Sequence, residues 1–143
     1  PLLANLPADL RALALDMNRL TLEAIPEDAR MPANLEKLTL QENRITDRGA
    51  VQLAGLLPAN LVSLFLANNA IGDMGAQALS TGLPANLEVL VLNGNRIGDR
   101  GAAWLAEGLP GRLAQLYLDS NAIGDTGAEA LLANLPANMR TFQ

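Results

Sequence analysis

The sequence of 143 residues contains no cysteine and no histidine, and only 3% of its residues are aromatic. Without cysteine, the chain has no disulfide framework, no thiolate nucleophile and no thiolate ligand for zinc. Without histidine, it lacks the imidazole base of Ser-His-Asp and Cys-His catalysis. We therefore expect no catalytic site, no metal site and no cofactor.

Positive charge is also scarce, because 10 Lys and Arg face 15 Asp and Glu and the net charge is −5. This balance argues against a general affinity for nucleic acid or for anionic lipid. No apolar run approaches the length of about 20 residues that a membrane span requires. Half of the residues are nevertheless apolar, which predicts a folded, soluble domain.

The apolar residues are mostly leucine and alanine, and they follow a repeat. The units LRALALDMNRL, LEKLTLQENRI, LVSLFLANNAI, LEVLVLNGNRI and LAQLYLDSNAI begin at residues 10, 35, 61, 87 and 113, at intervals of 25 or 26 residues. The last four continue with a [TG]-D-x-G-A-x-x-L segment and close with Leu-Pro. The predicted divisions are the end of a repeat at 1–9, an irregular repeat at 10–34, regular repeats at 35–60, 61–86, 87–112 and 113–138, and the start of another at 139–143.

This pattern resembles the leucine-rich repeat, and the IGDxGAxxLA segment is similar to the ribonuclease-inhibitor-like and bacterial GALA-type subclasses. The resemblance implies an α/β fold in the form of a right-handed solenoid of about five repeats. A parallel sheet forms its concave side and short helices form its convex side. We expect the chain to be one such array and part of a longer array or protein.

The residues of one unit support the same fold. Within Leu61–Leu66 the side chains alternate, so that Leu64 and Leu66 face inward while Phe65 faces outward. A single strand of this kind cannot bury its leucines, so the units must stack on one another. The helix that follows each strand is expected to bury Ala50, Leu53 and Leu57, or their equivalents, against the strands.

Two polar positions recur in every regular unit. The asparagines at 18, 43, 69, 95 and 121 fall where the chain leaves the strand, and we interpret them as bonding the backbone of adjacent coils rather than a ligand. The aspartates at 47, 73, 99 and 125 fall just before Gly-Ala, and we interpret each as the N-cap of its own helix. A calcium site is the alternative for these carboxylates.

Three departures from the repeat stand out. The first unit continues as TLEAIPEDARMPAN, where Pro26 opens either a short helix or an irregular turn. Trp104 stands where the other units have Gln52, Ala78 and Ala130, and it either covers the small residues of neighbouring helices or forms a convex contact site. Arg44 and Arg96 stand beside the asparagines, either as solubilising surface or as a rim that recognises an acidic partner.

The outward strand positions provide the candidate site. If the strands align, Ala14, Thr39, Phe65, Val91 and Tyr117 form one column, and Asp16, Gln41, Ala67, Asn93 and Asp119 form the next. An exposed apolar patch bordered by polar residues marks an interaction site, and Phe and Tyr are suitable anchors. The alternative is that such residues are simply good strand formers. The predicted partner-binding residues are Phe65, Val91, Tyr117, Val89, Thr39, Asn93 and Asp119.

The resemblance implies a non-catalytic module that binds a protein or peptide on its concave face. A narrower hypothesis is the recognition arm of a bacterial effector linked to a ubiquitin ligase. A third is a structural repeat that self-associates through uncapped ends as a homo-oligomer. An enzyme that uses Asp16, Glu42 and Asp119 is the remaining class, although these carboxylates belong to different coils. Either the cytoplasm or, for an effector, the host cytosol is compatible with the absence of cysteine.

Overall fold

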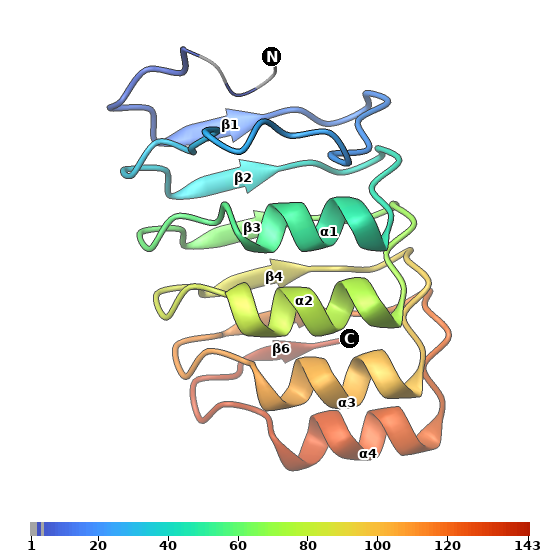
Figure 1. Ribbon diagram of the computed structural model, residues 1–143. Coiled ribbons are helices and arrows are strands. Elements are labelled where there is room, and N and C mark those ends of the chain that lie inside the picture. Colours follow the sequence, from blue (N-terminus) through green and yellow to red (C-terminus); the bar gives the residue numbers. More distant parts are fainter. Residues whose placement is uncertain (1–2, 4) are drawn as a thin grey trace.

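The structure is a computed structural model that describes residue 3 and residues 5–143. It is a leucine-rich-repeat solenoid in which one parallel sheet lies behind a layer of helices (Figure 1). The strands pair in chain order, from β1 at one end of the sheet to β6 at the other. The elements are β1 (Ala12–Ala14), β2 (Lys37–Thr39), α1 (Asp47–Ala54), β3 (Ser63–Phe65), α2 (Asp73–Gly82), β4 (Val89–Val91), α3 (Asp99–Glu107), β5 (Gln115–Tyr117), α4 (Asp125–Ala133) and β6 (Thr141–Phe142).

The strand register is the one that the repeat predicts. Leu38 pairs with Leu64, Leu64 with Leu90, and Leu90 with Leu116, so that equivalent residues stand side by side. The first repeat joins the same register through Leu13, which pairs with Leu38. Within the described residues, no helix is both long and apolar enough to cross a bilayer.

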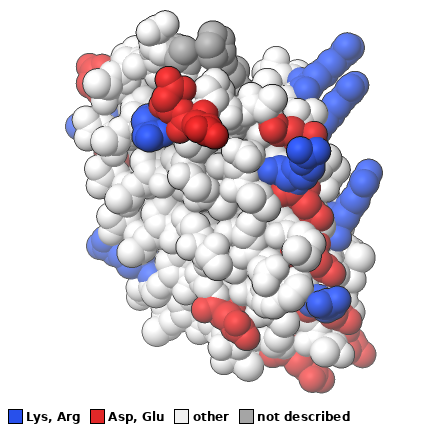
Figure 2. Space-filling model, in the orientation of Figure 1, with Lys and Arg blue, Asp and Glu red and all other residues white. Residues whose placement is uncertain are grey.

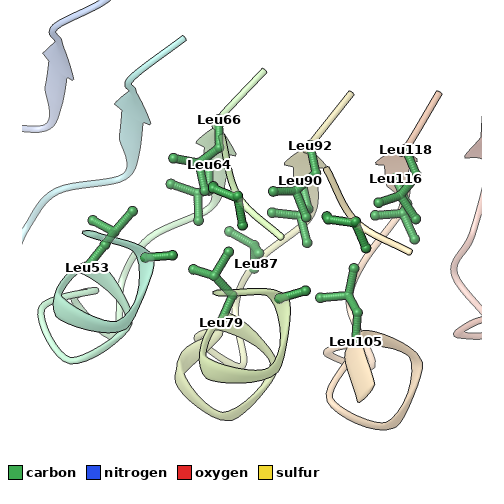
Figure 3. Close-up of a cluster of buried hydrophobic side chains, with 14 of the residues drawn as sticks. Leu53, Leu64, Leu66, Leu79, Leu87, Leu90, Leu92, Leu105, Leu116 and Leu118 are labelled. Carbon is green, nitrogen blue, oxygen red and sulfur yellow. The ribbon is translucent and has the colours of Figure 1, made fainter. Parts of the chain in front are cut away.

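The core lies between the sheet and the helices. Leu64 and Leu66 of one coil have no exposed surface, and the leucines of the neighbouring coils stack beside them (Figure 3). From the helix side, Leu53 is fully buried, as is Leu79 in the next helix. Burying a leucine side chain contributes about 1.5–3 kcal/mol. Because each coil packs only on its neighbours, this contribution arises from stacking and not within one coil.

The asparagines form the predicted ladder. The side-chain amide of Asn95 donates to the carbonyl oxygens of Leu66 (3.0 Å) and Leu92 (2.9 Å), and its Oδ1 accepts from the amide of Ile71 (3.1 Å). Asn69 and Asn121 repeat this pattern. The residue before each of the five asparagines has a left-handed backbone, with φ between 53° and 68°, although its identity varies: Met17, Glu42, Asn68, Gly94 and Ser120.

The aspartates do not cap their own helices, and this prediction was wrong. The N-cap residue of α2 is Gly72, and no side chain caps α2 from that residue. The cap comes from the preceding coil, because Oδ1 of Asp47 accepts from the amides of Gly72 (2.7 Å) and Gly75 (2.9 Å). A Cβ at Gly75 would lie 2.7 Å from the same oxygen, so glycine is what allows the approach. Asp73 and Asp99 bond the next helix in the same way.

The first repeat has no helix in the convex layer, so the irregular turn is the correct alternative for Pro26. The amide of Ala29 bonds the carbonyl of Pro26 (3.0 Å) in a turn. Where later repeats have aspartate, this one has Leu22, and Glu23 beside it accepts from the Thr46 hydroxyl (2.6 Å). The predicted repeat end at 1–9 falls partly on residues 1, 2 and 4, which lie outside the described residues.

Candidate functional site

The face of the sheet that is turned away from the helices carries the candidate site, and we call it the open face. Its central column contains Ala14, Thr39, Phe65, Val91 and Tyr117, which the strand register places side by side. Adjacent strands lie about 4.8 Å apart, so neighbouring side chains in the column are in contact distance. The sequence therefore identified which residues share this face.

Two residues of the column are less exposed than the sequence suggested. Val91 is 9% exposed and Thr39 is 7% exposed, although both were expected to belong to an exposed patch. Val91 lies between the larger side chains of Phe65 and Tyr117, which shield it from both sides. The Thr39 hydroxyl is turned to Oδ2 of Asp16 (2.9 Å). The accessible apolar surface is therefore that of Phe65 and Tyr117, with Val89 beside them and Val91 as the floor.

The open face has two hollows that share Phe65 and Gln41. The larger, of about 480 Å³, lies over β3 to β6, and the smaller, of about 330 Å³, lies over β1 to β3. The larger hollow is lined by the aromatic rings, the two valines, Gln41, Asn93, Gln115, Asp119 and Gln143. The predicted contact residues Phe65, Val89, Val91, Asn93, Tyr117 and Asp119 thus surround one hollow, while Thr39 lines the other.

Charged groups on the open face are few. Lys37 Nζ lies 5.3 Å from the centroid of the Phe65 ring, in a cation–π contact. Asp16 is held by the Thr39 hydroxyl and by the amide of Gln41 (2.7 Å). Asp119 is exposed, and among the described residues no hydrogen bond or ion pair reaches its carboxylate. Asp119 lines the larger hollow as an exposed carboxylate.

The carboxylates do not gather into a reacting group. Asp16 and Asp119 are separated by four strand spacings, a distance of about 19 Å. Among the described residues, no three acidic side chains come close enough to hold a metal ion together. Among the described residues, three of the four repeated aspartates bond the amides of the next helix: Asp47, Asp73 and Asp99.

The rim arginines lie at the edge where the chain leaves the strands. Arg44 and Arg96 are both exposed there. Figure 2 shows that acidic and basic side chains alternate along this edge, whereas the helix layer is mostly uncharged. The edge therefore provides charges of both signs and not a continuous basic surface.

Trp104 is partly buried on the helix layer. The guanidinium carbon of Arg100, one turn earlier in α3, lies 5.1 Å from the centroid of its ring. This cation–π contact shields part of the ring.

The sequence did not indicate a further hollow, which has a volume of about 520 Å³. It lies beside residues 26–33, the irregular segment of the first repeat, where the convex layer has no helix. The missing Asp and Gly-Ala in that unit were the only signal that could have located it. Arg30 lines this hollow, and its guanidinium bonds the carbonyls of Glu27 and Ala29 in its own loop.

The leucine-rich repeat family model matches residues 32–54, 58–80, 84–106 and 113–132, more than half of the chain. The chain belongs to the leucine-rich repeat family. This match is to the family as a whole and assigns no subclass. Leucine-rich repeats are generally non-catalytic interaction modules, and protein–protein interaction is the activity that the family suggests.

Solved structures with a similar chain include the octameric complex of Latrophilin 3 (Lec, Olf), Unc5D (Ig, Ig2, TSP1) and FLRT2 (LRR), at 19% identity and a TM-score of 0.45. That match covers 97% of this chain and 54% of the other. An internalin (InlF) from Listeria monocytogenes matches at 19% identity with a TM-score of 0.34, over 94% of this leucine-rich repeat chain and 47% of the internalin. This chain spans about half the length of both. No curated protein matches the sequence.

Proposed function

We propose that this leucine-rich repeat array binds a protein or peptide on its open face and has no catalytic role. The observation that supports the proposal is the pair of aromatic side chains, Phe65 and Tyr117, on either side of an apolar floor. Aromatic anchors at the centre of a hollow with a polar border are typical of residues that dominate binding energy. Val89 extends the apolar surface, while Asn93 and Asp119 border it.

The Phe65→Ala/Tyr117→Ala double variant is expected to weaken partner binding at least tenfold. Each ring is partly exposed, and neither belongs to the fully buried core. The variant should therefore keep the circular dichroism spectrum of the wild type while losing its anchors. The measurement is affinity capture from an extract of the source cells with both proteins. Calorimetric titration of the captured partner then follows.

The matched control removes two exposed apolar side chains from the helix layer. Val51 and Met74 are 51% and 58% exposed, and the Val51→Ala/Met74→Ala variant should bind the partner as the wild type does. Equal capture by the wild type and the open-face variant would overturn the proposal. Loss of binding in the control variant alone would assign binding to the helix layer.

The effector hypothesis is a narrower form of this proposal. It requires an F-box, which is the segment that links a bound target to a ubiquitin ligase. This F-box would lie elsewhere in the same gene product, outside the 143 residues of the array. Reading the flanking coding sequence tests it directly, because an F-box there would link the partner to ubiquitin ligation. Flanking sequence without an F-box would remove the effector hypothesis and leave the binding proposal unchanged.

Self-association is a second candidate function, and an exposed apolar side chain supports it. Leu132 on α4 is 60% exposed. Large exposed apolar side chains favour association between copies.

Light scattering across a dilution series tests self-association. If copies of the chain associate, the mean mass should fall towards that of the monomer, 15.1 kDa, as the protein is diluted through the micromolar range. The Leu132→Glu variant replaces this exposed apolar side chain with a charge and should shift the transition between monomer and assembly to higher protein concentration. A constant monomer mass for the wild type would exclude this candidate.

A further inference from the structure

Lys37 is a basic side chain on the open face, in the interior of the sheet. Its strand, β2, pairs with β1 on one side and with β3 on the other. The side chain leans towards β3, since its Nζ lies 5.3 Å from the centroid of the Phe65 ring. Both β3 and the strand after it, β4, are also paired on their two sides. The surroundings of this ammonium group are therefore set by strands within the described array.

The carboxylates of the neighbouring residues do not neutralise Lys37. Glu36, which precedes it, accepts from the guanidinium of Arg11 (2.8 Å) in an ion pair. Both oxygens of Asp16 are bonded by the next coil, one of them by the Thr39 hydroxyl (2.9 Å). In the part of the chain that the structure describes, no carboxylate lies within ion-pair distance of Lys37 Nζ. The positive charge of this side chain is thus left without a bonded anion.

The cation–π contact positions the ammonium group without using its hydrogen-bond donors. A ring face attracts the positive charge, whereas the three N–H groups of an ammonium bond to oxygen acceptors. No acceptor among the described residues is bonded by Lys37 Nζ, and its side chain is exposed, so that a partner can reach these donors. A negatively charged oxygen forms the strongest hydrogen bonds with such a donor. A carboxylate on the partner is therefore the complement of this position.

The Phe65 ring stands between this ammonium group and the apolar floor of the larger hollow. The ring lines both hollows, with Lys37 in the smaller one and Val89 and Val91 in the larger one. Val91 pairs with Phe65 from the strand after it, and Lys37 is on the strand before it. An apolar group on the floor and a carboxylate at Lys37 would then be one to two strand spacings apart, about 5–10 Å.

We propose that the open face selects a linear segment that has an Asp or Glu two positions away from an apolar side chain. The carboxylate pairs with Lys37, and the apolar side chain packs over Val91 beside the Phe65 ring. Side chains at positions i and i+2 of an extended peptide lie on one face about 6.7 Å apart, which is within the span that the two groups require. The inference rests on the proposed function and adds the chemical class of the partner, an acidic peptide segment.

The test begins with selection from a displayed library of random nine-residue peptides against the wild-type protein. The enriched sequences should share an aliphatic or aromatic residue with Asp or Glu two positions away. In one selected peptide, replacing the acidic residue with its amide should weaken binding about fivefold at low ionic strength, near the upper limit for an exposed ion pair. Fluorescence anisotropy measures both affinities. The difference should shrink as salt is added, because salt screens the attraction.

Two variants assign the preference to Lys37. Lys37→Met keeps an unbranched side chain beside the Phe65 ring but has no charge, so the acidic peptide and its amide should bind this variant equally well. Lys37→Arg retains the charge and should retain the preference. An acidic preference that Lys37→Met leaves intact would overturn the assignment to this side chain.

The matched control for net charge is Arg48→Met. It makes the same change in net charge as Lys37→Met, at an exposed position of α1 in the same repeat, and it should leave the preference unchanged. Loss of the preference in both methionine variants would show a general charge effect and would also overturn the assignment to Lys37.

The outcomes also distinguish this inference from the proposed function. Enriched peptides that lose binding in the Phe65→Ala/Tyr117→Ala variant but contain no excess of Asp or Glu would overturn the inference and leave the open-face proposal standing. A library without any enriched sequence would overturn the linear segment as the ligand, while the capture comparison would still decide the open face. Enriched peptides that bind the double variant as tightly as the wild type would overturn both.

Discussion

Replacing Asn95 with Ala is expected to lower the free energy of unfolding by about 3 kcal/mol, because buried polar groups lose their partners. Asn95 is 8% exposed, and its side chain bonds backbone groups of four residues in two coils: Leu66, Ile71, Leu92 and Asn93. Each buried donor or acceptor that is left unpaired costs about 1–3 kcal/mol. The loss is not fully additive, because a water molecule can enter the space that the side chain leaves.

The ladder offers its own control in Asn18. This side chain is exposed and, among the described residues, bonds only the carbonyls of Leu15 and Asp16, within its own turn. Asn18→Ala should therefore cost less than about 1 kcal/mol, since water replaces the lost bonds. Urea unfolding followed by circular dichroism measures both variants. Equal losses at the two positions would mean that the bonds between coils add nothing to the local turn.

The Asp73→Ala variant is expected to lose about 2 kcal/mol of stability, at the upper end for a helix cap. The bonds that this substitution removes are those to the start of α3, in the next coil, and not bonds within α2. Oδ1 of Asp73 accepts from the amides of Gly98 (2.7 Å) and Gly101 (3.0 Å) at the start of α3, so the substitution leaves two amides without their acceptor. Asp73→Asn retains an acceptor oxygen and should lose less.

Asp125 separates the two explanations for this effect. It begins α4 as Asp73 begins α2, so both carboxylates have the same relation to the dipole of their own helix. Among the described residues, however, no hydrogen bond reaches the Asp125 carboxylate. In a chain of these 143 residues, Asp125→Ala should therefore cost less than about 1 kcal/mol, the value of the dipole interaction alone. If guanidinium unfolding gives equal losses for both alanine variants, the aspartates act on their own helices after all.

The asparagine ladder bears on function because it fixes the backbone of the open face. Asn95 and Asn121 both bond the carbonyl of Leu92, directly after β4, and Asn69 and Asn95 both bond that of Leu66, directly after β3. The side chains of the central column are carried by strands that end at these bonds. A rigid backbone at this place presents Phe65 and Tyr117 without an ordering cost on binding. We expect the binding effects of the anchor variants to reflect lost contacts rather than altered strand positions.

The alignment of the strands was predictable from the repeat alone. Coils of nearly constant length bring the same position of each unit to the same place, and backbone bonds between strands hold that register. The alternation of Leu64, Phe65 and Leu66 likewise assigned the core and the open face, because strand side chains alternate between faces. The candidate anchors followed from these two regularities.

Which neighbour each side chain meets was decided only by the tertiary structure. The repeat places an aspartate at each helix start, where its carboxylate can reach amides either of its own helix or of the helix in the next coil. The spacing in the sequence does not distinguish these two partners, and the structure shows that Asp47 bonds the amides of the next helix. The shielding of Val91 depends on the size of the side chains on both flanks, and the position of the Asp16 carboxylate depends on Thr39 and Gln41 of the next coil. A periodic sequence determines where each residue stands in its coil. Contacts between coils depend on three-dimensional distances, which cannot be read from the length of the repeat.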